Sequence, residues 1–148
     1  MKLSMPMKII LAAIAYVVIG KIVNTLSAML TMSYYMDPNY FAVWSKIMMP
    51  GPGPPPAEFT YYGIAFAFIS GLIFSYIYTK VSSVIKGKGW MQKGLKYGFG
   101  VFLIAGIPMF LSMYLLINLP LGLLVDWMIV DGLIVYLLCG IAVSKIMK

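Results

Sequence analysis

Four long apolar runs dominate this sequence, at residues 9–32, 59–79, 95–117 and 121–143. Each is long enough for a membrane-spanning helix, which needs about 20 apolar residues to cross a hydrocarbon core of about 30 Å. Hydrophobic residues make up 62% of the 148-residue chain and charged residues only 10%, so a soluble domain of this size could not bury all four runs. The sequence therefore predicts an all-α fold: a four-helix transmembrane bundle formed by one integral-membrane domain over residues 1–148.

The lysines predict how the four helices are oriented. All eleven basic residues are Lys, and nine of them precede the first run, lie between the second and third runs or at the very start of the third, or follow the fourth. A four-helix hairpin places these three segments on one side of the membrane, with only Lys46 on the other side. Because cytoplasmic segments carry the lysine excess, we expect both termini and the basic loop at residues 80–94 to be cytoplasmic.

The loop at residues 33–58 is then the main segment on the outer side. Residues 40–49 are apolar and aromatic, which predicts a short helix lying along the membrane surface. A proline-rich stretch follows, and it favours an extended connection. Pro56 is well placed to start the second helix, with Glu58 in the first turn, where the helix dipole favours an acid.

Three charged residues fall deep inside the apolar runs, where an ionisable group is costly and usually paired or functional, whereas Lys96 lies at the edge of the third run. They are Lys21 in the first run and Asp126 and Asp131 in the fourth. Counting from the middle of each run places Lys21 and Asp131 at nearly the same depth, close to the membrane centre. Asp126 is expected about 7.5 Å further outward, at about 1.5 Å of rise per residue.

Asn24 and Thr25 lie one turn outward of Lys21, at a depth between those of the two acids. The candidate residues for a substrate or ion pathway are therefore Lys21, Asn24, Thr25, Asp126 and Asp131. One interpretation is a purely structural ion pair between Lys21 and Asp131. The other is a polar site for a proton, ion or small substrate, because Asp126 is one acid more than the single lysine balances.

Small residues mark a packing face on the second run, where Gly63, Ala67, Gly71 and Ser75 follow a four-residue spacing. Such a stripe lets another helix approach closely, although the sequence does not identify the partner helix. Pro108 lies near the middle of the third run and predicts a kink, because proline lacks the backbone donor that an unbroken helix uses.

Several functional classes lack the residues that they require. The sequence contains no His and a single Cys, Cys139, so it offers no imidazole metal site and no dithiol redox pair. It contains no phosphate-binding loop and no nucleophile elbow, and the absence of Arg disfavours nucleic-acid binding. We therefore expect a protein that is not an enzyme and has no catalytic residue, metal site, cofactor or nucleic-acid partner.

Two segments carry a resemblance to known proteins: WSKIMMP at residues 44–50, with the proline-rich stretch after it, and YLLINLPLG at residues 114–122. With these segments the chain resembles small uncharacterised prokaryotic four-helix membrane proteins of the domain-of-unknown-function kind. The resemblance implies a prokaryotic cell (plasma) membrane as the location. It implies no activity and no site residues.

The leading hypothesis is a small carrier or permeation protein with a charged intramembrane site between the first and fourth helices. Because four helices form a tight bundle, a continuous pathway would need a homo-oligomer or a larger membrane complex in addition to the lipid bilayer. The alternative is a non-catalytic membrane subunit or assembly scaffold whose buried charges are structural. Composition and spacing leave both hypotheses open.

Overall fold

The computed structural model describes residues 3–40, 55–117 and 119–148, and every regular element within these ranges is a helix. Four spans are long and apolar enough to cross a membrane: Met5–Leu30, Ala57–Val81, Trp90–Leu116 and Leu121–Met147. The prediction of an all-α fold with four such helices is confirmed. Most span ends extend beyond the predicted runs, because hydrophobicity marks only the part that crosses the bilayer whereas backbone hydrogen bonds continue past it.

Two of the spans are single α-helices and two are composite. Helix α1 (Met5–Leu30) is followed by the one-turn α2 (Met32–Tyr35), and α3 (Ala57–Val81) forms the second span. The other two spans each contain a π-helical segment, a wider turn with i→i+5 hydrogen bonds that occurs often at functional sites. The third span consists of α4 (Trp90–Val101), η2 (Phe102–Gly106) and α5 (Ile107–Leu116), and the fourth of α6 (Leu121–Asp126), η3 (Trp127–Ile134) and α7 (Val135–Met147).

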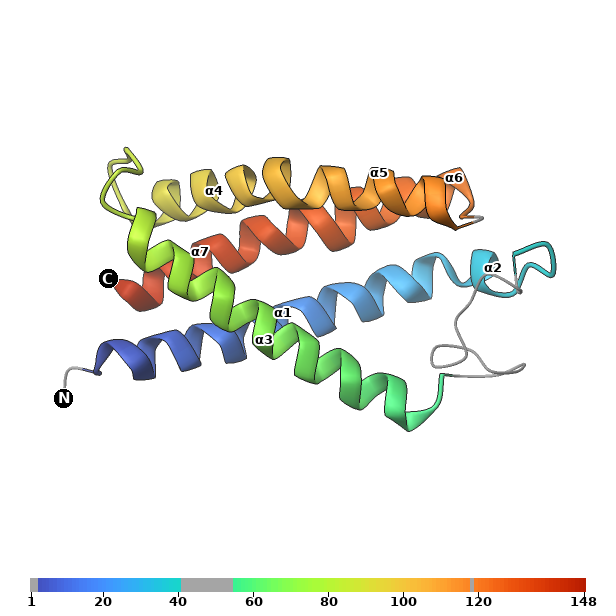
Figure 1. Ribbon diagram of the computed structural model, residues 1–148, viewed down its shortest axis with the longest axis horizontal. Coiled ribbons are helices and arrows are strands. Elements are labelled where there is room, and N and C mark those ends of the chain that lie inside the picture. The colour runs from blue at the N-terminus through green and yellow to red at the C-terminus, as the bar shows by residue number, and fades with distance from the viewer. Residues whose placement is uncertain (1–2, 41–54, 118) are drawn as a thin grey trace.

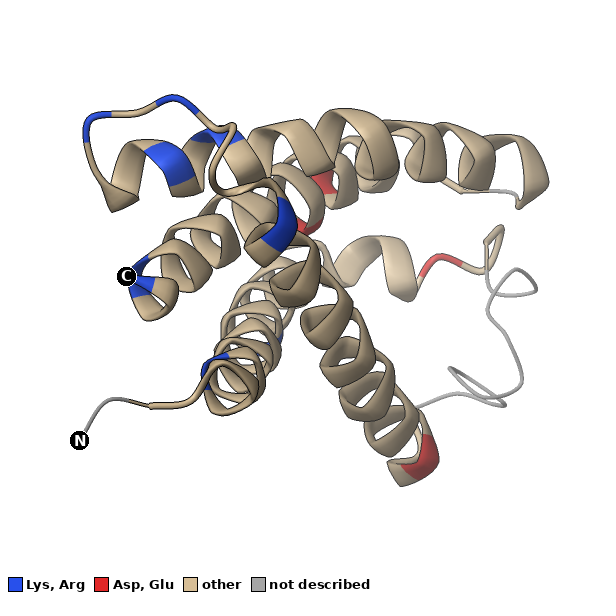
Figure 2. Cartoon of the chain, turned by 60° about the vertical axis from the view of Figure 1, so that its left-hand side comes forward, with Lys and Arg blue, Asp and Glu red and all other residues tan. Residues whose placement is uncertain are grey.

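The chain termini and the connection at residues 82–89 lie at the same end of the bundle (Figure 1). Helix α4 packs along α7, while α1 packs against both α3 and α7. The Nζ of Lys8 donates a hydrogen bond to the carbonyl of Met147 at 3.3 Å, which ties the two terminal segments together. Most of the basic segments gather at this end (Figure 2), which we call the basic end. Its assignment to the cytoplasm stays a prediction.

Glycines allow the closest approach between α4 and α7. A Cβ atom added to Gly94 would lie 2.5 Å from the carbonyl oxygen of Gly140, and one added to Gly140 would collide with the backbone at Gly94. One turn further along α4, Gly98 lies directly against the backbone of Tyr136. The third and fourth spans therefore meet through their backbones, as small residues permit in membrane bundles.

The small-residue stripe of α3 faces α1. Gly71 is buried, and a Cβ added there would lie 2.9 Å from the Cα of Ala13 and 2.9 Å from the Cβ of Tyr16. Ser75 is completely buried, and its hydroxyl has no hydrogen-bond partner among the residues that the structure describes. Gly63 and Ala67 are only half-buried. The tight contact is thus confined to the half of the stripe that is nearer the basic end.

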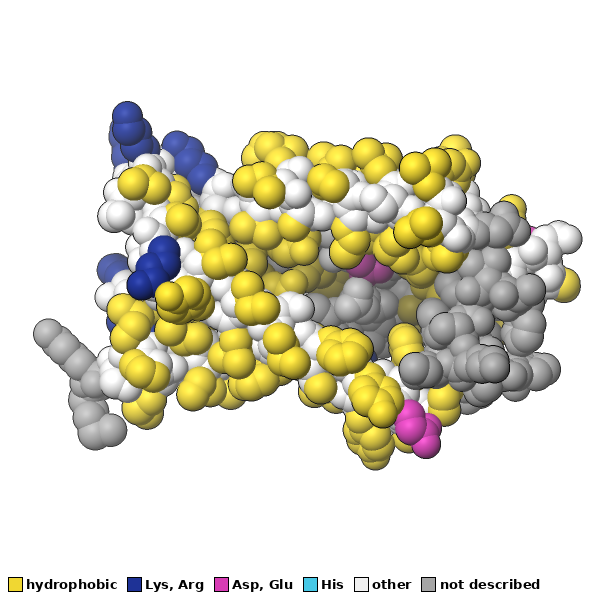
Figure 3. All heavy atoms as spheres, in the orientation of Figure 1, with side chains coloured by type: hydrophobic (Ala, Val, Ile, Leu, Met, Phe, Trp, Pro, Cys, Tyr) yellow, Lys and Arg dark blue, Asp and Glu magenta, His cyan; other side chains and the backbone are white. Residues whose placement is uncertain are grey.

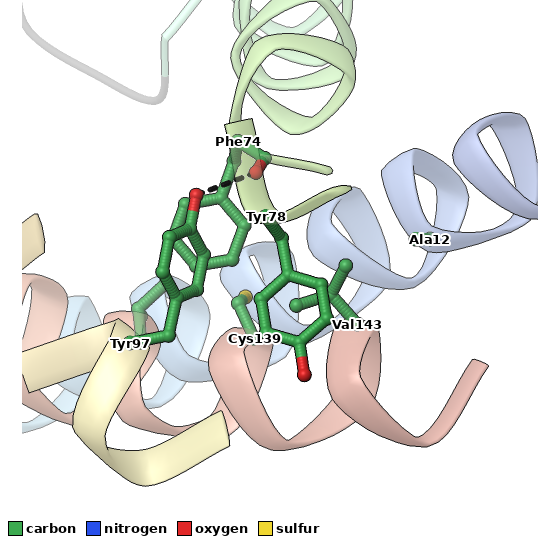
Figure 4. Close-up of a cluster of buried hydrophobic side chains, with 7 residues drawn as sticks. Ala12, Phe74, Tyr78, Tyr97, Cys139 and Val143 are labelled. Atoms are coloured by element: carbon green, nitrogen blue, oxygen red, sulfur yellow. Dashed lines mark hydrogen bonds between the residues drawn. The ribbon is translucent and has the colours of Figure 1, made fainter. Parts of the chain in front are cut away.

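Aromatic side chains fill the bundle on the basic side of its middle (Figure 4). The ring centroid of Phe74 lies 4.6 Å from that of Tyr97, whose ring is in turn 5.0 Å from that of Tyr78. The Tyr97 hydroxyl donates to the Phe74 carbonyl at 2.6 Å, and the hydroxyls of Tyr78 and Ser144 are 2.6 Å apart. We call this group, with Cys139 beside it, the aromatic cluster. The three rings are each no more than 5% exposed, so the cluster is a tightly buried part of the bundle.

The predicted distortion at Pro108 takes the form of a π-helical turn. The amide of Ile107 bonds to the carbonyl of Phe102, five residues earlier, at the end of η2. Proline cannot donate a hydrogen bond, and its ring crowds the carbonyl four residues before it, here that of Ile104. The wider π turn directly before Pro108 accommodates both effects.

The start of α3 agrees with the sequence prediction, since Pro56 caps the helix and Glu58 lies in its first turn. Before it, the backbone amide of Asn39 donates to a carboxylate oxygen of Asp37 at 2.9 Å, which forms a turn after α2. The surface helix predicted for residues 40–49 falls almost entirely outside the described residues, so it stays a prediction.

Candidate functional site

The π-helical segment η3 brings the two intramembrane acids onto one face. Asp126 ends α6 and Asp131 lies within η3, five residues later. Residues five apart on an α-helix point about 140° away from each other, because each residue turns the helix by about 100°. In a π-helix the i→i+5 hydrogen bonds stack residues five apart. Asp126 and Asp131 can therefore both face α1.

Helix α1 meets these acids with two polar side chains. The Nδ2 of Asn24 donates to Oδ1 of Asp131 at 2.5 Å. The hydroxyl of Ser27 lies 2.5 Å from Oδ2 of Asp126 and 3.3 Å from Oδ2 of Asp131. Because Asn24 and Ser27 are three residues apart, they share one face of α1. We call Asn24, Ser27, Asp126 and Asp131 the carboxylate site.

One hydroxyl between two carboxyl groups has a consequence for protonation. Ser27 is 1% exposed, so bulk water does not reach its hydroxyl to form hydrogen bonds. That hydroxyl carries only one hydrogen. The hydroxyl is placed to donate to Oδ2 of Asp126 at 2.5 Å or to Oδ2 of Asp131 at 3.3 Å, and its single hydrogen serves one of them at a time. The other contact contains a hydrogen only if one of the two carboxyl groups is protonated.

Polar and aromatic side chains border the site on the side away from the basic end. The hydroxyl of Thr31 donates to the carbonyl of Ser27 at 2.8 Å, and the indole of Trp127 donates to the hydroxyl of Tyr35 at 3.0 Å. Burial raises the pKa of the Tyr35 hydroxyl above its usual range, an effect that the Trp127 hydrogen bond opposes and that the two acids reinforce. Tyr35 thus keeps its proton at neutral pH beside the carboxylate site.

The predicted pairing of Lys21 with Asp131 is wrong in this structure. Within the described residues no acid lies within 4.0 Å of the Lys21 amino group. That group lies instead beside α3, 3.8 Å from where a Cβ on Gly63 would be. The physical reason is angular: Lys21 and Asn24 point about 60° apart around α1, and α3 rather than the fourth span lies on the side of Lys21.

Ser27 belongs to the last turn of α1, and Asp126 and Asp131 are the sixth and eleventh residues of the 27-residue fourth span. The site therefore extends from near the middle of the bundle into the half away from the basic end, and its depth in a membrane stays a prediction. Asp126 and Asp131 are half-buried, while Asn24 and Thr25 are exposed, and no hydrogen bond joins the described Thr25 to either acid. Acidic side-chain atoms are visible between apolar ridges in this half of the molecule (Figure 3).

Ser27 is the functional side chain that the sequence analysis missed. A signal for it existed, because Asn24, Ser27 and Thr31 follow the three- and four-residue spacing of one helix face. This polar stripe on an apolar helix marks the face that meets the acids better than the charge of Lys21 does. Tyr35, which lies beside the site, was missed as well.

The comparisons with known proteins identify no relative. The chain matches no protein-family model, no curated protein and no solved structure. The resemblance to uncharacterised prokaryotic four-helix proteins therefore stays a prediction. Within the ranges that the structure describes, no three His, Cys, Asp or Glu side chains gather to form a metal-binding group. Any proposal about function therefore rests on the contacts at the carboxylate site.

Proposed function

We propose that this polytopic membrane protein binds an exchangeable proton at the carboxylate site and acts as a small carrier or permeation protein. The observation that supports this proposal most directly is the sharing of the Ser27 hydroxyl by Asp126 and Asp131. No lysine in the described part of the chain lies within 4.0 Å of either acid. The two acids must therefore obtain their charge compensation from elsewhere.

Electrostatics favours a proton as that compensation. A charged side chain inside a membrane span costs upward of about 3 kcal/mol, and two neighbouring carboxylates oppose each other's ionisation. One proton on the pair removes a full charge and supplies the hydrogen that the contact between Asp131 and Ser27 needs. Because Asp126 and Asp131 are half-buried rather than sealed, we propose that this proton exchanges with the outside.

Transport requires more than the single closed bundle. The aromatic cluster fills the bundle between the carboxylate site and the basic end, with Phe74 and Tyr97 each 5% exposed. A proton that reaches the acids from the outer side therefore needs a rearrangement of this cluster, or a second chain, to continue. We propose a homo-oligomer or a larger membrane complex as the transporting unit. The chemistry at the acids is then binding and release of a proton, without catalysis.

A second candidate function rests on the same hydrogen bonds. Asn24 and Ser27 bond across from α1 to the fourth span, which fixes the relative height of the two helices. Such bonds in membrane bundles contribute about 0.6–2 kcal/mol each. If these hydrogen bonds serve only to fix the relative height of the two helices, the protein is a non-catalytic subunit or assembly scaffold whose acids are structural.

Proton flux in reconstituted liposomes distinguishes the two functions. A potassium gradient with valinomycin sets the membrane potential, and a trapped pH-sensitive dye reports proton entry. We expect flux above that of empty liposomes for the parent and for Glu58→Gln, which removes an exposed acid outside the carboxylate site. Asp126→Asn and Asp131→Asn are expected to reduce flux to the level of empty liposomes while the protein remains folded.

Two results would favour the structural subunit instead. One is a parent flux no greater than that of empty liposomes under either polarity of the potential. The other is a parent flux that Asp126→Asn and Asp131→Asn leave unchanged while lowering the thermal unfolding midpoint. Repeating the assay with a sodium gradient alone tests for coupling: a dye response driven by that gradient would mean that sodium movement is coupled to proton movement.

A further inference from the structure

A hollow of about 370 Å³ opens at the basic end of the bundle, between the connection at residues 82–89, the start of α4 and the end of α7. It is separate from the carboxylate site, because the aromatic cluster lies between them. The polar and aromatic side chains of its lining are Tyr78, Ser82, Lys88, Trp90, Lys93, Ser144 and Lys148.

The lining is strongly positive and has no acidic side chain to balance it. Lys88, Lys93 and Lys148 contribute three amino groups. Lys93 is held toward the hollow by a 3.3 Å hydrogen bond from its Nζ to the carbonyl of Ser82. Lys145 adds positive charge nearby, since its Nζ lies 5.5 Å from the centre of the Trp90 ring. The four acids of the chain are Asp37, Glu58, Asp126 and Asp131, and none of them lines the hollow.

Hydroxyl groups accompany the lysines. Tyr78 and Ser144 are hydrogen-bonded to each other at 2.6 Å, so one of the two hydroxyls donates and the other keeps its own hydrogen for another acceptor. An oxyanion in the hollow would meet several ammonium donors and one hydroxyl donor. Phosphate oxygens are the acceptors that such a set of donors suits.

We propose that this hollow binds a phosphate group, and that the phosphate belongs to the headgroup of an anionic membrane lipid. Basic pockets between transmembrane helices recognise anionic headgroups at the cytoplasmic surface. The hollow lies where three of the spans end, which is headgroup level, and Trp90 beside it is a side chain that favours this level. The position favours a lipid as the source of the phosphate over a soluble anion.

The test compares two pairs of lysines at the basic end. Lys88→Gln with Lys93→Gln removes two charges from the lining, and Lys80→Gln with Lys86→Gln removes two exposed charges outside it. Each protein is purified in a neutral detergent, and its thermal unfolding midpoint is followed during titration with three probes. The probes are a short-chain phosphatidylglycerol, phosphatidylcholine with the same chains, and inorganic phosphate at constant ionic strength. A ligand that binds the folded state raises the midpoint as it saturates.

We expect saturable stabilisation of the parent by phosphatidylglycerol and little by phosphatidylcholine, whose choline cancels the charge. The lining pair should weaken the apparent Kd about 20-fold, at the usual contribution of a lysine near an anionic surface. The outer pair should weaken it less than about threefold. Should the lining pair not fold, Lys88→Glu and Lys80→Glu provide the same comparison at two exposed positions.

The probes also identify the source of the phosphate. A saturable shift with phosphatidylglycerol but not with inorganic phosphate supports the lipid. An equal shift with inorganic phosphate, lost in the lining pair alone, supports phosphate binding but assigns it to a soluble anion. Equal weakening in both lysine pairs would mean diffuse attraction to the surface and would overturn the proposal, as would no saturable shift with any probe.

Discussion

Ser27 is the residue on which the two intramembrane acids depend. It is almost fully buried and contacts both carboxyl groups with a single hydroxyl. Removing a hydrogen-bond partner from a buried polar group typically costs about 1–3 kcal/mol, and one donor hydrogen between two carboxyl groups leaves one of the two contacts without a hydrogen unless the proposed proton supplies it. Asn24 satisfies only the other oxygen of Asp131.

A substitution of Lys21 tests whether this lysine is paired with an acid. Because it has no acid within 4.0 Å among the described residues, Lys21→Met should change the free energy of unfolding by less than about 1 kcal/mol, or raise it by removing a charge from the span. Chemical or thermal denaturation in detergent measures this. If Lys21→Met lowers the free energy of unfolding by about 3–5 kcal/mol, the usual effect of breaking a buried ion pair, the result would support an ion pair between Lys21 and Asp131.

Sequence reasoning came close to the site but chose the wrong partner. Counting along the spans correctly associated the first helix with the fourth and placed Asn24 near Asp131. It selected Lys21 because opposite charges attract, whereas the direction in which each side chain points depends on how α1 is rotated against its neighbours. That rotation is fixed by packing contacts such as Ala13 against Gly71, which no single sequence reveals.

At the scale of the elements, η3 has the largest effect on the site. Its π-helical winding converts a five-residue spacing, which an α-helix would spread over two faces, into one face. A π segment behaves as an α-helix with one extra residue, so it can realign side chains while the helix beyond keeps its register. The site thus depends on backbone winding as much as on residue identity.

Removing one residue tests this winding. Deleting Ile129 should convert η3 to α-helix, leave the acids four residues apart on one face, and preserve the register of α7. Deleting Leu138 from the regular α7 should instead rotate the rest of that helix by about 100° and disrupt its contact with α4. The two residues are equally exposed, at 41% each, so loss of side-chain burial is matched.

Thermal unfolding of the two deletion variants in detergent is the measurement. The Ile129 deletion is expected to retain cooperative unfolding near the parent midpoint, and the Leu138 deletion to lose it. Equal loss in both deletions would indicate that the segment at residues 127–134 is wound as an ordinary α-helix.

The contact between α1 and α3 makes a second prediction at this scale. Gly71→Ala should destabilise the protein by about 1–3 kcal/mol, because the new methyl group would meet the backbone of Ala13 and no flexible side chain can give way. Gly100→Ala is the matched control, since nothing lies within 4 Å of a Cβ at that helical position. Equal unfolding free energies for the two variants would mean that the α1–α3 contact is looser than the structure shows.

The elements were more predictable than their internal winding. Hydrophobic runs located all four spans, and the stripe through Gly71 and Ser75 located a real packing face. The π segments were not predictable, because the apolar sequence WMIVDGLI at residues 127–134 fits an α-helix equally well. Only for η2 did a residue, Pro108, indicate that the helix would be distorted there.

At the scale of the whole molecule, charge is segregated along the bundle axis. The basic end holds the termini and the connection at residues 82–89 (Figure 2). The aromatic cluster lies next to it, and the carboxylate site lies beyond that cluster. The proposed proton site in one half of the bundle and the lysine-rich hollow at the opposite end would give the two membrane faces different chemistry. The orientation of the bundle therefore decides which compartment the acids sense.

Cysteine labelling tests this orientation in a Cys139→Ala background. Val84→Cys lies in the basic connection with Val84 74% exposed, and Glu58→Cys lies at the start of α3, at the other end of that span. We expect an impermeant maleimide added outside intact cells to label position 58 and not position 84, because lysine-rich segments stay in the cytoplasm. Labelling of both positions from the same side would contradict the four-span topology, and labelling of position 84 alone would invert it.

The central claim is that Asp126 and Asp131 share a proton through Ser27, and infrared spectroscopy of the protein in bilayers tests it most directly. The carbonyl stretch of a protonated carboxylic acid is separate from the bands of carboxylates, and it shifts in heavy water. We predict that this band is present at neutral pH in the parent and in Glu58→Gln, and absent in Asp131→Asn. A parent spectrum without the band at neutral pH would show both acids ionised and would contradict the shared proton.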